Sequence, residues 1–367
     1  MTRPTHVVLA AGGTAGHIAP ALNLADALRI EEPAIQITVI GSERGLEQSL
    51  VPARGYPLIT VPSVAMPRRL SSDLVTVGPR VRRASRLTAQ HLRDLQTDVV
   101  VGFGGYASLP AYLAARRVGC SLVIHEGNAK PGLANRVGAR FTKDVYVSVK
   151  GSLPGTPLGL PLDAAIAGLD RAAVRAQART AFGLRPDGPV LLAFGGSQGA
   201  QRINEAIAQA LPQLLDSGIQ VLHAFGARNP VPAPAAGYIA VPFIERMDLA
   251  YAAADLGLTR AGGMTVAEVA AVGLPTVFVP LPIGNGEQRL NALGVVQAGG
   301  GVLIDNSQLT GAWLVDEVRS LILDPDRLVV MGEAAARVGV RDSSQRLAVE
   351  VLRIAHRHRS STEGETP

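Results

Sequence analysis

The feature that most constrains the fold is a short sequence motif that occurs twice in the chain. An apolar run enters Gly-Gly, then a hydroxyl residue, one further residue and Gly, and a helical pattern follows. The first copy spans Val7 to Gly16 and the second spans Val190 to Gly199. Such a turn directs free backbone N–H groups and the positive end of a helix at a point where an anion can sit. The sequence therefore predicts two α/β domains, each with a glycine-rich turn after its first strand.

The two turns differ from the common nucleotide-binding fingerprints. Neither has the Gly-x-Gly-x-x-Gly spacing or the lysine of a Walker loop, so dinucleotide and ATPase sites are not indicated. About half of the single turns of this kind in α/β proteins are only tight connections and bind no ligand. Two at the same point of successive domains favour binding, because ligands of open α/β sheets bind at the carboxyl ends of strands.

The rest of the chain repeats the same alternation of strand and helix. Expected strands lie at 6–10, 36–40, 98–101, 121–124 and 144–147, and again at 190–194, 220–225, 255–259 and 276–280. With 367 residues, two domains are the natural division. Residues 151–163 are rich in Gly and Pro, so we place the boundary there, giving domains 1–160 and 161–344. Residues 360–367 are expected to form a flexible tail.

Composition and charge limit the cellular compartment and the kind of membrane contact that can be expected. Cys120 is the only cysteine, which excludes an intrachain disulfide and favours a reducing compartment. No export signal is expected, and the longest uncharged stretch is interrupted by prolines, so any membrane contact should be peripheral. Seven arginines and two aspartates lie between Met66 and Asp94, a local surplus that matches the net charge of +5. Apolar residues between these arginines favour an anionic membrane surface, although a solvated helix face is the alternative.

Two residues beside the glycine-rich regions have both a functional and a purely structural interpretation. His17 directly follows the first turn, where a neutral imidazole could accept a proton from an acceptor hydroxyl, or could simply donate to a carbonyl. Glu268 could accept the two hydroxyls of a ribose. Alternatively, Thr265 and Glu268 have the spacing of a capping box at a helix start.

Further polar residues follow other strands of the first half. Gly104-Gly105-Tyr106 and His125-Glu126-Gly127-Asn128 should lie at the same rim as His17. No Asp-x-Asp stands in a plausible metal position. We therefore expect no cofactor and no dedicated metal site, with the leaving diphosphate stabilised by helix N-termini and loop amides.

Taken together, these motifs resemble the MurG family over nearly the whole chain. The resemblance is carried by Gly12–His17, Gly104–Tyr106, His125–Asn128, Gly195–Ala200 and Arg260–Glu268. It implies two Rossmann-like domains facing each other across a cleft, the GT-B glycosyltransferase architecture. It also implies that a final helix near 345–359 returns to the N-terminal domain. The implied enzyme is a hexosyltransferase that inverts the anomeric centre as it moves N-acetylglucosamine from UDP-GlcNAc to lipid I, which yields lipid II.

The resemblance also implies roles for particular residues. His17 is the candidate base. The implied donor-side residues are Thr14, Ala15, Gly16, Asn128, Ser197, Gln198, Gly199, Ile244, Met264, Thr265, Glu268 and Gln288. The implied acceptor-side and membrane-side residues are Gly104, Gly105, Tyr106, Glu126, Arg68, Arg69, Arg80, Arg82, Arg83 and Arg86. The implied partners are UDP-GlcNAc, lipid I, the anionic cytoplasmic membrane surface and other cell-wall synthesis proteins, with no nucleic acid.

Three residues depart from the family pattern. Ala15 replaces a frequent Gly, Glu287 replaces the first Gln of a frequent pair, and Asp163 stands where an Arg often contacts the nucleotide. Because an anion at position 163 would repel a diphosphate, a catalytically weakened homologue acting as a scaffold is one alternative. The other is a related UDP-sugar enzyme, either an epimerase or a glycosyltransferase with a small acceptor.

Overall fold

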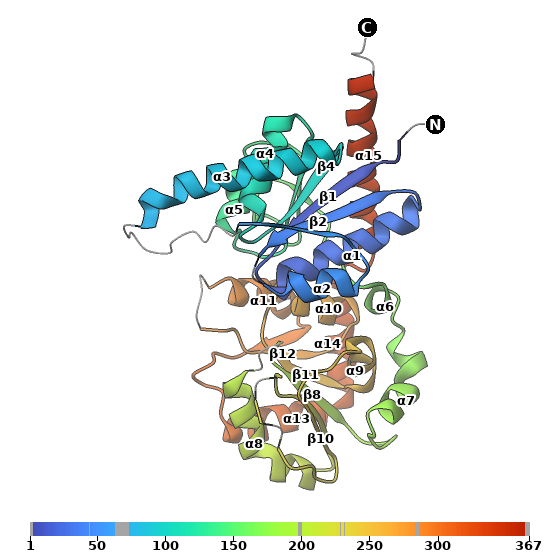
Figure 1. The fold of residues 1–367 in the computed structure, drawn as a ribbon. Coiled ribbons are helices and arrows are strands. Elements are labelled where there is room, and N and C mark those ends of the chain that lie inside the picture. The colour runs from blue at the N-terminus through green and yellow to red at the C-terminus, as the bar shows by residue number, and fades with distance from the viewer. Residues whose placement is uncertain are drawn as a thin grey trace. The chain divides into compact units, whose positions relative to one another are not determined.

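The structure is a computed structural model that divides into two compact units. It describes residues 3–43, 45–62, 73–196, 200–227, 229–230, 232–282 and 286–363. Unit 1 comprises Met1–Asp163 and Asp342–Pro367, and unit 2 comprises Ala164–Arg341. The chain thus leaves unit 1 close to the expected boundary and returns to it at the end (Figure 1).

Unit 1 is built on a seven-stranded parallel sheet with the order β3-β2-β1-β4-β5-β6-β7. Its strands are β1 (His6–Ala11), β2 (Gln36–Ser42), β3 (Leu58–Val61), β4 (Val99–Gly104), β5 (Ser121–Glu126), β6 (Val145–Val147) and β7 (Thr156–Pro157). Its helices are α1 (Ala15–Glu31), α2 (Glu47–Ala53), α3 (Asp73–Asp94), α4 (Ser108–Val118), α5 (Leu133–Gly138) and α15 (Ser343–Glu363).

Unit 2 repeats this plan with a six-stranded parallel sheet, ordered β10-β9-β8-β11-β12-β13. The strands are β8 (Val190–Phe194), β9 (Gln220–Ala224), β10 (Tyr238–Val241), β11 (Leu256–Thr259), β12 (Thr276–Phe278) and β13 (Gly301–Leu303). The helices are α6 (Ala164–Ala167), α7 (Arg171–Ala181), α8 (Gln201–Asp216), α9 (Met247–Ala253), α10 (Gly263–Ala271), α11 (Glu287–Gln297), α12 (Gly311–Trp313), α13 (Arg319–Ile322) and α14 (Pro325–Val338), and a π-helical turn spans Leu314–Val318.

Each sheet is buried on both faces, as parallel sheets covered by crossover helices must be. In β1, Val7 and Leu9 point into the core shared with α1 and α15, whereas Val8 and Ala10 point into the core shared with α4. Strand β8 divides its side chains between two cores of unit 2 in the same way. This two-sided burial explains why the strands read as continuous apolar runs in the sequence.

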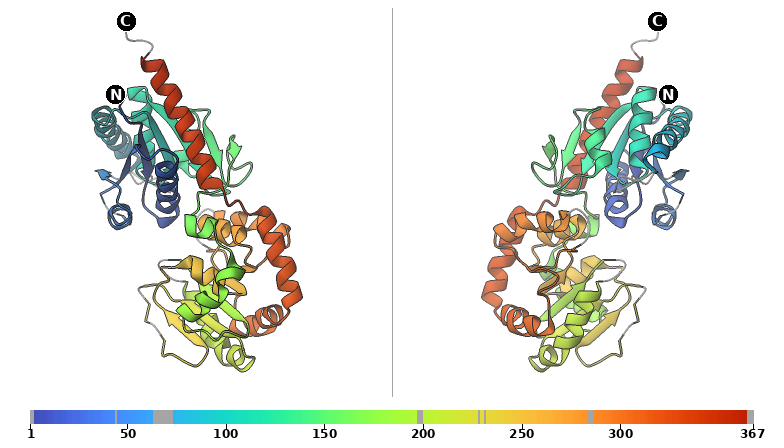
Figure 2. Two further views of the ribbon diagram at one scale, coloured as in Figure 1. Left: turned by 90° about the vertical axis from the view of Figure 1, so that its right-hand side faces the viewer. Right: turned by 90° about the vertical axis from the view of Figure 1, so that its left-hand side faces the viewer.

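Helix α15 returns to unit 1 and completes one of its hydrophobic cores (Figure 2). Its buried face consists of Leu347, Ala348, Val351, Leu352, Ile354 and Ala355. At its start, Ser343 Oγ donates to the carbonyl oxygen of Leu160 at 2.6 Å, and Ser344 Oγ donates to that of Leu162 at 2.7 Å. The helix continues to Glu363, so residues 360–363, expected to belong to a flexible tail, are helical.

The structure also contains four strands that the sequence analysis did not predict. They are β3, β7, β10 and β13, none longer than four residues. Strand β7 lies within the segment that was expected to be only a connection between domains. Within the described part of the chain, no helix is both long and apolar enough to cross a lipid bilayer.

Candidate active site

The strand orders place one switch point in each unit. The order reverses between β1 and β4 in unit 1, and between β8 and β11 in unit 2. At such a point the connections leave toward opposite faces of the sheet, which opens a crevice at the carboxyl ends of the two strands. In unit 1 the crevice is bordered by Gly12–His17 and Gly104–Tyr106. In unit 2 it is bordered by Arg260–Glu268 and by the described part of the second glycine-rich turn, Gly195, Gly196 and Ala200.

In unit 1 the two glycine-rich loops lie in direct contact. A Cβ at Gly105, whose φ is +88°, would lie 2.1 Å from the carbonyl oxygen of Gly12. The Tyr106 ring covers Gly13, since a Cβ there would lie 3.2 Å from its nearest carbon. The Gly105 contact requires glycine because it is with backbone, and at Gly13 a φ of +88° favours glycine. The loops after β1 and β4, predicted separately from the sequence, therefore form one rim.

His17 lies on this rim, in the first turn of α1. Its ring is close to Gly104, where a Cβ would lie 3.4 Å from Nε2. The Nδ1 atom is 3.1 Å from Thr14 Oγ1. Burial lowers the pKa of His17, and a hydrogen bond with the backbone of Gly12 only partly opposes this. When Nδ1–H donates to Thr14, Nε2 carries the lone pair of a neutral imidazole, which is the form that a general base needs.

Glu47 supports the first turn, and the sequence analysis missed it. Its carboxylate is fully buried at the start of α2. It accepts hydrogen bonds from Gly13 N at 3.2 Å, from Ser42 N at 2.8 Å and from the Ser42 hydroxyl. Burial acts to raise the pKa of Glu47, but these hydrogen bonds outweigh it and the net shift is downward. The Gly13 amide, predicted to bind an anionic ligand, thus donates its hydrogen bond to the Glu47 carboxylate of the protein itself.

Glu126 forms a second buried carboxylate centre in unit 1. It accepts hydrogen bonds from Asn128 N at 2.9 Å, Gly132 N at 3.1 Å and Asn135 Nδ2 at 2.9 Å. Asn135 Oδ1 in turn accepts from the Tyr112 hydroxyl at 2.6 Å. Burial raises the pKa of Glu126, and these hydrogen bonds oppose the rise. Asn135, another residue the sequence analysis missed, also borders Gly104, so this network reaches the His17 rim.

The described part of the basic segment, Asp73–Asp94, forms α3, which has a polar outer face. Arg80, Arg82, Arg83 and Arg86 are exposed, whereas Arg68 and Arg69 lie outside the described residues. Val77, Val81 and Ala84 pack together on the inner side of the helix. Leu87 is 38% exposed. The described apolar residues between the arginines therefore differ in exposure, since Val77 is buried, Val81 is half-buried and Leu87 is exposed, and contact of α3 with a membrane surface stays a prediction.

In unit 2, Glu268 lies in the second turn of α10 rather than at its start. The helix begins at Gly263 and its N-cap is Gly262, so the capping-box interpretation of Thr265 and Glu268 is wrong. Glu268 Oε2 accepts a hydrogen bond from the Tyr251 hydroxyl at 2.7 Å. The Glu268 side chain is half-buried, as are Met264 and Thr265. A carboxylate held at this rim has the chemistry to accept hydroxyl donors.

The loop that leads from β11 into α10 is fixed by α11. Gln288 Oε1 accepts from Ala261 N at 3.2 Å and from Leu281 N at 2.9 Å, and Asn291 Nδ2 donates to Ala261 O at 3.3 Å. Gln288, predicted to contact the sugar, thus also joins two loops at this rim.

The remaining predicted donor-side residues of unit 2 lie on two loops. Ile244 lies between β10 and α9, with its side chain in the core. Gly196 has a φ of +92°, and Ser197, Gln198 and Gly199 lie outside the described residues.

Asp163, the most unusual departure, belongs to an ion-pair chain within unit 1. Its Oδ2 is 2.5 Å from Arg54 Nη2, while Arg54 Nη1 is 2.6 Å from Asp26 Oδ2. The carboxylate at position 163 therefore has a guanidinium beside it, which reduces the repulsion of a diphosphate that its charge alone implies. Across the described residues, no cluster of three or more His, Cys, Asp or Glu side chains could hold a metal ion.

Each unit is Rossmann-like, with the His17 imidazole at the switch point of unit 1 and the Glu268 carboxylate at that of unit 2, and the domain families that the chain matches assign it to the glycosyltransferases. Residues 7–147 match the glycosyltransferase family 28 N-terminal domain, and residues 190–347 match the corresponding C-terminal domain. The sequence-based predictions of two Rossmann-like domains and of a glycosyltransferase are confirmed.

Individual relatives refine this assignment. A UDP-N-acetylglucosamine–N-acetylmuramyl-(pentapeptide) pyrophosphoryl-undecaprenol N-acetylglucosamine transferase from Streptomyces avermitilis is 54% identical, covering 96% of this chain and 100% of the relative. The crystal structure of MurG from Acinetobacter baumannii superimposes with a TM-score of 0.77 at 28% identity, covering 95% of this chain and 100% of that one. The chain belongs to the MurG family, within glycosyltransferase family 28.

More distant structures share the fold alone. The calicheamicin glycosyltransferase is 22% identical with a TM-score of 0.67, covering 97% of this chain and 99% of that one. The individual site roles inferred from the resemblance remain predictions.

Proposed function

We propose that this protein transfers N-acetylglucosamine from UDP-N-acetylglucosamine to lipid I, the undecaprenyl-pyrophosphoryl muramyl-pentapeptide, and so forms lipid II for peptidoglycan. The observation that carries this proposal is the 54% identity, over the full length of the relative, to a transferase named for this reaction. The His17 rim and the Glu268 rim supply the two kinds of group that the reaction needs, a neutral base and a carboxylate for the nucleotide.

In the proposed reaction, His17 Nε2 accepts the proton of the acceptor hydroxyl. The hydroxyl oxygen forms a bond to the anomeric carbon of the donor sugar while the bond from that carbon to the diphosphate oxygen breaks. UDP leaves with the bonding electron pair, and the anomeric centre is inverted because attack and departure occur on opposite faces. The Gly195–Ala200 turn and the N-terminus of α8 stabilise the charge on the diphosphate, with no metal ion and no cofactor assigned to the step.

The donor is held mainly by unit 2 in this proposal. Glu268 accepts the ribose hydroxyls, the backbone at Ile244 binds uracil, and Gln288, Met264 and Thr265 lie near the sugar and phosphates. On unit 1, Thr14, Ala15, Gly16 and Asn128 complete the donor side, while Gly104, Gly105, Tyr106 and Glu126 form the acceptor side.

The decisive experiment incubates the protein with UDP-GlcNAc and a soluble lipid I analogue, and measures UDP release together with the disaccharide product. We expect stoichiometric amounts of both. UDP binding without any disaccharide would overturn the proposal and favour the scaffold. Transfer to a small aglycone, but not to the lipid I analogue, would identify the small-acceptor enzyme. Appearance of an epimerised UDP-sugar would identify the epimerase.

We also propose that the protein acts at the cytoplasmic membrane surface, to which the outer face of α3 binds electrostatically. Its arginines are exposed while its neighbouring valines face inward, which supports surface attraction rather than insertion. Each basic residue near an anionic bilayer contributes about 1 kcal/mol.

Liposome flotation tests this proposal. Replacing Arg80, Arg82, Arg83 and Arg86 by Gln should abolish flotation with anionic vesicles. A control that replaces Arg117, Arg140, Arg327 and Arg337, which are exposed elsewhere, should still float. Equal loss of flotation in both variants would show that α3 is not the contact.

A further inference from the structure

Glu268 is held from a neighbouring helix by a buried tyrosine. The Tyr251 hydroxyl donates to Glu268 Oε2 at 2.7 Å, and the Tyr251 side chain is fully buried in α9. Burial raises the pKa of Tyr251 well above its usual value, and the Glu268 carboxylate raises it further. The phenol therefore stays protonated near neutral pH and remains a hydrogen-bond donor.

One arginine ties together the two helices that carry this pair. Arg171, the first residue of α7, donates from Nε to Tyr251 O at 2.9 Å, from Nη2 to Ala254 O at 2.6 Å and from Nη1 to Gly273 O at 2.8 Å. These carbonyls lie at the C-terminal ends of α9 and α10, where a cation is favourable to the helix dipoles. Burial lowers the pKa of Arg171 to about 10, which still leaves it charged near neutrality.

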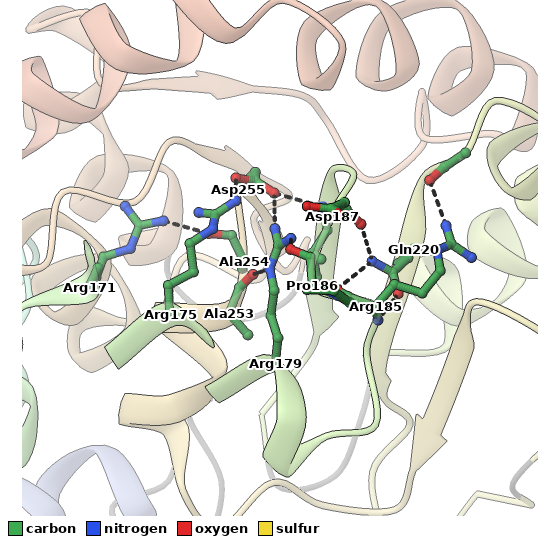
Figure 3. Close-up of polar contacts among 12 residues, drawn as sticks. Arg171, Arg175, Arg179, Arg185, Pro186, Asp187, Gln220, Ala253, Ala254 and Asp255 are labelled. Atoms are coloured by element: carbon green, nitrogen blue, oxygen red, sulfur yellow. Dashed lines mark hydrogen bonds and ion pairs between the residues drawn. The ribbon is translucent and has the colours of Figure 1, made fainter. Parts of the chain in front are cut away.

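We call the contacts of Arg171 with the ends of α9 and α10 the Arg171 clamp. Two further arginines on the same face of α7 strengthen it. Arg175 Nη2 is 2.5 Å from Asp255 Oδ1, while Arg179 donates to Ala253 O at 3.3 Å and to Asp255 Oδ2 at 3.0 Å. Figure 3 shows the three arginines directed at residues 253–255. Because α7 fixes α9 at several points, the position of the Tyr251 ring, and with it the Glu268 oxygen, is set by rigid structure.

A fixed carboxylate binds a ligand better than a mobile one. An unrestrained Glu side chain loses rotamer entropy when it is ordered. A hydrogen bond already made in the free protein removes part of that cost before the ligand arrives. Tyr251 contacts Glu268 without being at the exposed rim itself, so its effect on a ligand would be exerted through Glu268.

We propose that Tyr251 is a positioning residue for the nucleotide: its hydroxyl, held in place by the Arg171 clamp, fixes Glu268 in the orientation in which the carboxylate accepts the ribose hydroxyls. This inference rests on the proposed function, in which Glu268 binds the ribose of UDP. It assigns to Tyr251 a role in affinity for the ribose and none in the chemical step.

Calorimetric titration of UDP and of 2′,3′-dideoxy-UDP into the full-length protein tests the proposal. In the wild type, UDP should bind more tightly than the dideoxy analogue. Tyr251→Phe should weaken UDP binding about 5- to 10-fold, the effect of one hydrogen bond, and leave the affinity for the dideoxy analogue unchanged. In transfer assays the variant should raise KM for UDP-GlcNAc by the same factor, with kcat changed less than about 2-fold.

Tyr238→Phe is the matched control. Tyr238 is also buried in unit 2, and its hydroxyl lies 3.3 Å from His223 Nδ1 rather than near Glu268. Tyr238→Phe should leave the ratio of the affinities for UDP and the dideoxy analogue unchanged, even if the substitution lowers the melting temperature. In a Glu268→Ala background, Tyr251→Phe should cause no further loss of UDP affinity.

The outcomes separate this inference from the function on which it rests. If the wild type discriminates between the two nucleotides but Tyr251→Phe discriminates equally well, the positioning role is wrong and the proposed function stands. Additive losses in the double variant would also overturn the positioning role. If the wild type does not bind UDP, or binds both nucleotides alike, the ribose role of Glu268 fails and the inference falls with it.

Discussion

The glutamates at the rims of the two units are held in different ways. In unit 1, Glu47 and Glu126 are buried and accept hydrogen bonds from backbone amides of the loops that border the site. In unit 2, Glu268 is half-buried and is held by a side-chain hydroxyl. Unit 1 uses carboxylates to shape its own loops, whereas unit 2 presents one at its surface. Two copies of the same strand-turn-helix motif can therefore have different roles.

The difference changes the interpretation of the first glycine-rich turn. Gly13 N–H, expected to be available to an anion, is bonded to Glu47. A phosphate at that amide would have to compete with a buried carboxylate. This hydrogen bond supports the proposal that the first turn lies beside a neutral sugar hydroxyl near His17 and that the turn in unit 2 binds the diphosphate.

The largest effect should come from His17→Ala. Loss of a general base typically lowers turnover by about 10²- to 10⁴-fold. UDP affinity should change less than about 2-fold if His17 serves the acceptor side. Steady-state kinetics and calorimetry together check this split, with His356→Ala as an exposed control. Comparable losses in turnover and UDP affinity would place His17 on the donor side and remove the contrast between the units.

The pH dependence of the same step follows from the direction of the pKa shift. A base whose pKa is lowered stays neutral, and therefore active, to lower pH than an ordinary histidine. The acidic limb of kcat/KM for the acceptor should therefore fall below pH 6.5, the usual histidine value. An acidic limb above that value would contradict the buried, neutral state of His17.

Glu268→Ala should have the next largest effect, on binding rather than on chemistry. Hydrogen bonds to a charged group contribute about 1.5–3 kcal/mol, so UDP affinity should fall roughly 10- to 100-fold. Turnover at saturating donor should change little. Glu245→Ala, an exposed glutamate of the same unit, serves as the control. If saturating donor fails to restore turnover, Glu268 acts in the chemical step as well.

Glu47→Gln should reduce the stability of unit 1 while leaving UDP affinity unchanged. The new amide group faces the Ser42 and Gly13 N–H donors, so one donor loses its acceptor, at a cost of about 1–2 kcal/mol. Chemical denaturation measures this change, and Glu43→Gln, an exposed neighbour, is the control. Full stability combined with weaker UDP binding would mean that Glu47 is not a support of unit 1.

The smallest effect concerns His125, buried in unit 1 with Nε2 at 2.8 Å from Gly159 O. Burial lowers the pKa of His125 to about 4. The unfolded chain takes up a proton on His125 near pH 6.5, whereas the folded chain does not. The free energy of unfolding is therefore highest above that pH and decreases as the pH falls. Between pH 7 and pH 5.5 the loss should be about 1 kcal/mol. Ring NMR signals of His125 that titrate near 6.5 would contradict this state.

Much of the fold could be predicted because parallel strands buried on both faces are continuous apolar runs, as in Val7–Ala10. The strands that were missed are short and lie toward the sheet edges, where Pro57 precedes β3 and β13 begins with Gly301. At the site, His17 and Glu268 could be found because each adjoins a recognisable turn. Glu47, Asn135 and Tyr251 could not, since only the folded chain brings them to these rims from separate helices.

The return of α15 to unit 1 has a consequence for synthesis on the ribosome. All of unit 2 is contiguous in the sequence, and it is complete once Arg341 has been made. Unit 1 lacks Leu347, Val351 and Ile354 from its core until the last part of the chain emerges. The middle of the polypeptide should thus mature before its beginning, opposite to the usual N-terminal-first order. A nascent chain stalled before α15 would expose the apolar face of β1 and α1 to chaperones.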